Sequence, residues 1–232
     1  MFRSATLSIV ATALLTVSAS ALTLTAIDDA NTLRSAPTVN QGGGGTSVGL
    51  KQATTAQANS RTGFFKFNLA GVLPTAGDTA TFTFSLGSSA TADFGLRVFA
   101  LKADVAGYDW SEDTITWNSS PGLDSSTDAN FFLDPADVTL LRSLDVISGS
   151  PAGTKFSTTL ADWDSFRQAD ATLTLILLAA TQSNASPSLA VASSENGTVA
   201  NRPTLTIVPE PGSTLLLATG LMAFARRRRT RA

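Results

Sequence analysis

Apolar and polar residues alternate in two runs of the chain, at residues 64–69 and 81–86. A repeat of two is typical of a β-strand with one face in a protein core and the other face in water. The expected core faces are Phe65, Phe67 and Leu69 in the first run and Phe82, Phe84 and Leu86 in the second. The opposite face of the first strand, which includes Phe64 and Lys66, is expected to face solvent.

Other short segments have strand composition and are separated by turn residues such as glycine, proline, serine and aspartate. The segment 173–179 is almost entirely apolar, as expected of a central strand. The remaining predicted strands are at residues 26–29, 96–100, 114–117, 143–147, 189–191 and 205–207.

The sequence also predicts one helical turn, which begins near residue 159. Residues 159–162 read TLAD and match a capping box, in which Thr159 would cap the turn. Leu160, Trp163 and Phe166 are spaced to face inward. Many short strands with polar turns and a single helical turn predict an all-β fold, an antiparallel β-sandwich of jelly-roll type.

The N-terminus has the composition of a secretory signal peptide. Arg3 is followed by an apolar stretch at residues 5–17 and then by the small residues Ala19 and Ala21. These features match the charged region, the hydrophobic region and the cleavage site of such a leader. We therefore expect a signal helix at residues 1–21 that is cut after Ala21, with a short buried helix as the alternative.

The composition changes abruptly at residue 208. A Pro-Glu-Pro sequence precedes the apolar segment 213–225, which as a helix would span about 20 Å, less than the roughly 30 Å of hydrocarbon in a bilayer. The basic end would stay in the cytoplasm. The residues of this arrangement are Pro209, Glu210 and Pro211, followed by Arg226, Arg227, Arg228 and Arg229.

This C-terminal arrangement resembles the PEP-CTERM sorting signal of Gram-negative bacteria that make exopolysaccharide. The resemblance implies processing near Pro209 by an exosortase, a membrane protease. It also implies a short C-terminal hydrophobic helix that holds the protein in the membrane before processing, with an ordinary tail anchor as the alternative.

Residues 108–121 hold the only tyrosine and two of the three tryptophans. Within them, residues 110–118 read WSEDTITWN and are followed by Pro121. This run resembles the hallmark of the DNRLRE domains, extracellular β-sandwich modules grouped with family 96 of the carbohydrate-binding modules. Further matching segments, in the order that the family requires, are 61–70, 96–100, 194–196 and 202–205. The resemblance implies a sandwich domain at residues 22–207 between the leader and a sorting segment at 208–232.

The amino-acid composition excludes several kinds of function. The chain has no cysteine and no histidine, so Ser-His-Asp and Cys-His catalysis and nearly all zinc chemistry have no residues to act through. Ten basic and seventeen acidic residues lie between residues 22 and 207, which gives a net charge of −7. An acidic body argues against nucleic acid as a partner, because phosphate binding needs a basic face.

Carboxylates near the hallmark suggest two further kinds of chemistry. A glycosidase needs two carboxylates that face each other across a cleft, and acids that are neighbours on one turn rarely do so. A hard cation such as calcium takes oxygen ligands, although the spacing here does not fit an EF-hand loop and solvated surface acids are the alternative. The candidate calcium ligands are Asp104, Asp109, Glu112 and Asp113.

Sugar binding uses aromatic faces together with hydrogen-bonding or basic side chains on an exposed sheet face or loop. The candidates are Tyr108, Trp110, Phe64, Lys66, Lys51 and Arg61, with ordinary core and edge packing as the alternative. Trp117 and Trp163 are expected in the core. Related modules include alginate binders, but a net charge of −7 would repel a polyuronate unless calcium bridged the two.

These observations predict a secreted, surface-sorted protein of a Gram-negative bacterium that associates with extracellular polysaccharide and is not an enzyme. No cofactor is expected, apart from the calcium that the acidic residues allow. A structural or adhesive matrix or envelope protein without specific glycan binding is the first alternative, and a polysaccharide-degrading enzyme is the second.

Overall fold

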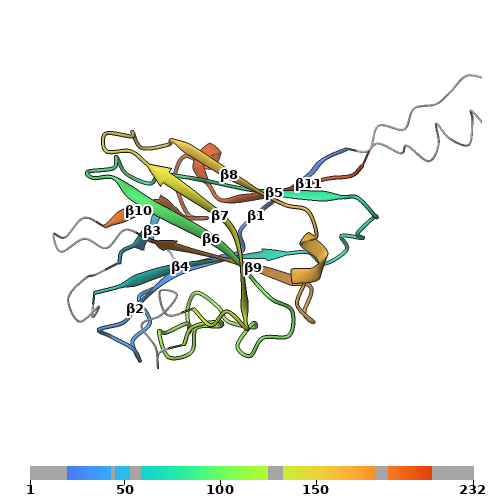
Figure 1. Cartoon of the computed structure of the whole chain (residues 1–232), viewed down its shortest axis with the longest axis horizontal. Coiled ribbons are helices and arrows are strands. Elements are labelled where there is room, and N and C mark those ends of the chain that lie inside the picture. The colour runs from blue at the N-terminus through green and yellow to red at the C-terminus, as the bar shows by residue number, and fades with distance from the viewer. Residues whose placement is uncertain (1–19, 43–44, 53–58, 125–132, 181–187, 211–232) are drawn as a thin grey trace, which may run out of the picture. The chain divides into compact units, whose positions relative to one another are not determined.

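Two antiparallel sheets pack face to face in the computed structural model (Figure 1), which describes residues 20–42, 45–52, 59–124, 133–180 and 188–210. The four-stranded sheet has the order β1 (Leu22–Thr25), β11 (Thr204–Val208), β5 (Thr79–Ser85) and β8 (Lys155–Leu160). The five-stranded sheet has the order β2 (Asp28–Leu33), β4 (Arg61–Asn68), β9 (Thr172–Ala179), β6 (Phe94–Leu101) and β7 (Val138–Val146). A separate pair consists of β3 (Ser47–Leu50) and β10 (Leu189–Ala192).

The strand order is that of a jelly roll. If β1, β4 to β9 and β11 are taken as the eight strands of that fold, one sheet has the order first, eighth, third, sixth. The other has the order second, seventh, fourth, fifth, with β2 added at its edge. The predicted all-β sandwich of jelly-roll type is therefore confirmed.

The main core lies between the two sheets and is rich in phenylalanine. Phe65 and Phe67 of the five-stranded sheet contact Phe82 of the four-stranded sheet, and the series continues through Phe84 to Phe156. Neighbouring ring centroids in this series are 5.4 to 5.9 Å apart, the usual distance for packed aromatic side chains. The predicted core faces of both alternating runs are confirmed, as is the central position of the fully buried strand β9.

The prediction that Phe64 and Lys66 face water is wrong. Both side chains are buried, because residues 102–124, which follow β6, cover the outer face of the five-stranded sheet (Figure 1). A second hydrophobic cluster forms there, which we call the outer core. It contains Ala30, Phe64, Phe99, Leu101, Val105, Trp110, Ile115, Leu133, Val138, Ile176 and Leu178.

The predicted helical turn is present, but its predicted cap is wrong. Thr159 lies in β8, where it pairs with Thr81 of β5, so it does not cap a helix. The turn is the 3₁₀ helix η2 (Trp163–Phe166), whose N-cap Asp162 makes no side-chain capping bond. A second 3₁₀ helix, η3 (Val199–Asn201), precedes β11. Trp163 is buried in the main core, as expected.

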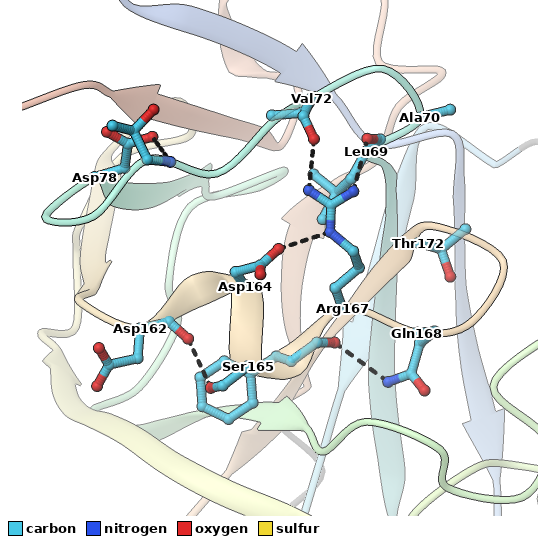
Figure 2. A network of polar contacts seen from close by, with 12 residues as sticks. Leu69, Ala70, Val72, Asp78, Asp162, Asp164, Ser165, Arg167, Gln168 and Thr172 are labelled. Atoms are coloured by element: carbon cyan, nitrogen blue, oxygen red, sulfur yellow. Dashed lines mark hydrogen bonds and ion pairs between the residues drawn. The ribbon is translucent and has the colours of Figure 1, made fainter.

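Arg167, directly after η2, fastens this turn to the loop that follows β4 (Figure 2). Its Nη2 donates to the carbonyl oxygen of Val72 at 2.8 Å and its Nη1 to that of Leu69 at 3.3 Å. Its Nε pairs with the carboxylate of Asp164 at 2.7 Å, and the guanidinium lies 5.4 Å from the ring centroid of Trp163. One side chain thus holds the end of η2 against the neighbouring loop.

Residues 21–210 form one compact unit. The predicted signal segment with Ala19, and the C-terminal segment with Pro211 and the arginines at 226–229, lie outside the described residues. Ala21 is exposed directly before β1, and Glu210 is exposed after β11. Within the described ranges, no helix is long and apolar enough to cross a membrane.

Candidate functional site

The hallmark segment forms turns instead of the strand predicted at residues 114–117. Hydroxyl groups bind the local backbone: Ser119 Oγ accepts from the N–H of Thr116 at 2.9 Å, and Ser120 Oγ donates to the carbonyl oxygen of Thr116 at 2.7 Å. Serine and threonine compete with strand pairing in this way, which explains why β-branched residues did not form a strand here. The Asn40 amide holds the segment by donating to the carbonyl oxygens of Glu112 (2.8 Å) and Ile115 (2.9 Å).

Trp110 is the centre of the contact between the hallmark segment and the sheet. Its ring packs edge-to-face on Phe64 with centroids 5.9 Å apart, and its Nε1 donates to Thr174 Oγ1 at 3.1 Å. Lys66, which pairs with Thr174 across β4 and β9, donates from Nζ to the carbonyl oxygen of Trp110. The Lys66 Nζ also lies 4.8 Å from the centroid of the Trp110 ring.

The charge of Lys66 is enclosed by the outer core. Burial lowers the pKa of its ammonium group, while the carboxylates of Asp28, Asp170 and Asp109 act in the opposite direction. Its hydrogen bond to a main-chain oxygen and its position over an indole ring compensate part of the desolvation cost. Lys66 is therefore a structural anchor for Trp110.

These contacts correct the predicted set of sugar-binding residues. Phe64, Lys66 and Trp110 come together, but Lys66 and Trp110 are only 4% and 5% exposed, so none of the three presents a face to a ligand. Tyr108 is half-buried against the outer core. Lys51 and Arg61 are partly exposed and face each other across an antiparallel bridge, about 17 Å along β4 from Lys66.

The four predicted calcium ligands do not form a common site. Asp104, Asp109 and Asp113 are exposed, and Glu112 is partly buried. Over the ranges that the structure describes, no three acidic side chains converge in a way that would hold a metal ion. The Glu112 main chain and side chain instead join the segment to β2: its N–H donates to Asp28 Oδ1 at 3.2 Å, and its Oε2 accepts from the N–H of Asp29 at 3.5 Å.

Sequence reasoning missed a buried carboxyl group at Asp29. It is 3% exposed, and its Oδ2 accepts from the N–H of Ser194 at 2.5 Å, which ties β2 to the segment before η3. Burial raises its pKa to about 7; the Ser194 N–H opposes this shift, and the carboxylates of Glu195 and Glu112 add to it. An Asp28–Asp29 doublet inside a strand was the available clue, since aspartate is depleted in strands.

The Asp29 group does not have the geometry of a catalytic acid. A carboxyl group that acts on a polysaccharide must reach the sugar, whereas Asp29 is sequestered behind the main chain of Ser194. Burial also raises the pKa of Glu112, with the Asp29 N–H lowering it and Glu195, Asp28 and Asp113 raising it. These carboxyl groups join three segments of the fold, so we assign them a structural role.

Two of the depressions on the described surface bear on ligand binding. The larger, of about 570 Å³, is lined by residues 74–78 and 161–165. Of its three carboxylates, Asp78 accepts from the N–H groups of Thr75 and Glu210, and Asp164 pairs with Arg167. The third, Asp162, is exposed and makes no capping bond to η2. Trp163 lines it but is only 1% exposed, so this groove offers no aromatic face.

The smaller depression has a volume of about 220 Å³ and lies beside the outer core, on the outer face of β6 and β7. Among the residues that the structure describes, its lining is apolar apart from Arg97, which has a further contact within the protein. Its lining residues are Arg97, Phe99, Leu133, Pro135, Val138 and Leu140. We refer to it as the β6–β7 depression.

A jelly-roll sandwich of this type belongs to the class that includes lectin domains, although the fold alone does not fix a function. Within that class, the model of carbohydrate-binding module family 96 matches residues 20–149, which is 130 of the 232 residues. The chain belongs to this family. A PEP-CTERM protein-sorting motif matches residues 208–229, and a search of the curated proteins finds no match.

Proposed function

We propose that the protein is exported and binds extracellular polysaccharide through its jelly-roll domain without cleaving it. The observation that carries the proposal is the family 96 match, which includes the whole hallmark segment and the strands β2 and β4 on which it packs. The β6–β7 depression adds a largely apolar surface on the same domain.

Binding without cleavage is supported by the position of the carboxyl groups. Glycoside hydrolysis uses two carboxyl groups on opposite sides of the scissile bond. Among the described residues, those that line the β6–β7 depression include no carboxylate, and Asp29, the group whose pKa is raised to about 7, is buried inside the fold. The bonded carboxylates of the larger groove serve local structure.

The sorting motif supports a surface location. A signal peptide would direct export, and an exosortase-type protease would process the chain near Pro209 after a transient stage in the membrane. The protein would then remain at the cell surface or in the extracellular matrix of a Gram-negative bacterium. This order of events fits a domain that meets its polysaccharide outside the cell.

The test is affinity electrophoresis of the purified protein through gels that contain neutral or acidic polysaccharides, once with calcium and once with a chelator. We expect retardation by at least one polymer and no release of reducing ends from it. A folded protein that ran unretarded in every gel would favour a structural or adhesive role instead. Release of reducing ends that Glu112→Gln abolishes would favour an enzyme.

A further inference from the structure

The C-terminal sorting motif begins inside the folded domain. The match to this motif starts at residue 208, and Val208 is the last residue of β11, where it pairs with Thr79 of β5. Pro209 has no N–H group, so it cannot continue the hydrogen-bonded ladder of the sheet. The next main-chain donor of the motif is therefore the N–H of Glu210.

Asp78, which directly precedes β5, accepts this N–H. Its Oδ1 lies 3.3 Å from the Glu210 nitrogen. The carboxylate belongs to a closed turn, because Asp78 Oδ2 accepts from the N–H of Thr75 at 2.8 Å and the Asp78 N–H donates to the carbonyl oxygen of Thr75 at 2.9 Å. Asp78 is only 5% exposed. The fold thus holds this acceptor in position before Glu210 reaches it.

The side chain of Glu210 rests on the same turn. Gly77 has a φ of +89°, which glycine adopts without strain. A Cβ at residue 77 would occupy the same space as the carboxyl group of Glu210, so the missing side chain of Gly77 makes room for that group. The turn at residues 75–78 therefore contacts both the main chain and the side chain of the glutamate in the sorting motif.

These contacts affect proteolysis, because a protease takes its substrate as a chain that has left its own fold. Cleavage of a folded protein proceeds through a locally opened state, and its rate follows the population of that state when opening and closing are fast. To free the chain around Pro209, the Glu210 N–H must leave Asp78. One hydrogen bond of ordinary net strength lowers the open population by about fivefold.

We propose that the turn at residues 75–78 is a docking site for the sorting motif and that it delays processing of the chain until Glu210 is released. The inference rests on the proposed function, in which an exosortase-type protease processes the chain near Pro209. The folded domain thereby sets how long the protein stays at its membrane stage.

Two measurements on the full-length protein test the docking and the delay separately. Hydrogen exchange of the purified protein reports the release of the Glu210 N–H, and pulse–chase labelling in the producing bacterium reports the conversion of precursor to processed protein. Asp78→Ala should increase both rates by about fivefold. Asp78→Asn keeps one acceptor oxygen for the two N–H groups, so it should increase both rates by less.

Asp170→Ala is the matched control. Asp170 also holds a loop before a strand, because its Oδ1 accepts from the N–H of Thr172 at 3.0 Å and from the Thr172 hydroxyl at 2.7 Å. Its bonds fix the start of β9 and not the sorting motif, so both rates should stay at the wild-type values. If Asp78→Ala does not unfold cooperatively in urea, the Asp78→Asn rates decide the test.

The other outcomes would overturn the inference in different ways. Unchanged exchange at Glu210 in Asp78→Ala would show that the motif is not docked. Faster exchange with unchanged or slower processing would show that docking does not delay the protease, and equal acceleration by Asp170→Ala would show a general loss of stability. If the wild type is never processed near Pro209, the sorting part of the proposed function fails together with this inference.

Discussion

Asp29→Asn should remove most of the pH dependence of stability between about pH 4 and pH 7. The folded pKa of Asp29 is about 7, against 3.8 for an unperturbed aspartate. Between these values the folded state keeps a proton that the unfolded chain has lost, so the free energy of unfolding falls as pH rises. About three pKa units correspond to about 4 kcal/mol, a stability present below pH 4 and lost by about pH 8.

The free energy of unfolding of Asp29→Asn should therefore exceed that of the wild type at high pH and differ little from it at low pH. Asparagine keeps an oxygen that can accept from the Ser194 N–H, while it removes the charge whose burial is unfavourable. Allowing about 1 kcal/mol for a less favourable hydrogen bond, we expect Asp29→Asn to be about 3 kcal/mol more stable than the wild type at pH 8. In this variant Glu112, whose pKa is also raised, should still cause a smaller decrease of the free energy of unfolding as pH rises.

Urea unfolding followed by tryptophan fluorescence at constant ionic strength, at pH 4.5, 6 and 8, measures this effect. Asp145→Asn serves as the control, because it removes an exposed carboxylate from β7 and should keep the wild-type slope. The reasoning would be refuted if wild-type stability were equal at pH 4.5 and pH 8. It would also be refuted if Asp29→Asn lost as much stability as the wild type over that range.

Three further predictions follow from the packing. Trp110→Ala should lower the free energy of unfolding by about 3–5 kcal/mol and Trp110→Phe by clearly less, both by urea titration; a loss below about 1 kcal/mol for alanine would show that the outer core is not stabilising. Arg167→Lys should cost about 1–2 kcal/mol in thermal unfolding, because lysine cannot bond both loop carbonyls and Asp164 together (Figure 2); unchanged stability would contradict this. Gly77→Ala should speed amide exchange at Glu210, because Gly77 has a φ of +89°, which alanine rarely adopts, so the turn that positions Asp78 to accept the Glu210 N–H would shift; exchange at the wild-type rate would contradict it.

The strands of the main core were predictable because each has one face in a uniform environment. Apolar residues repeat every second position in 64–69 and 81–86 because one face of each strand is buried between the sheets. The nearly continuous apolar run of β9 indicates burial on both faces. The outer face of β4 was misjudged for a related reason. Phe64 and Lys66 look like an exposed face locally, and only the return of residues 102–123 across the sheet buries them.

The candidate site was less predictable because it depends on contacts between distant segments. Local composition does not show that Trp110 would pack on Phe64, or that Ser194 would reach Asp29. The bulge that exposes Leu140 follows from a register shift between two strands that are separated by more than thirty residues. Of the two hallmark tryptophans, Trp117 was correctly expected in the core and Trp110 was wrongly assigned to the surface.

The burial of the hallmark changes what the family match implies about ligands. Trp110 and Trp117 are buried, and Lys66, which could have served as a cationic sugar contact, is occupied by the Trp110 carbonyl oxygen. The hallmark segment is therefore diagnostic of the fold, because its buried residues complete the outer core. If the domain binds a glycan as we propose, the choice of glycan depends on residues other than these three, whose side chains reach the surface.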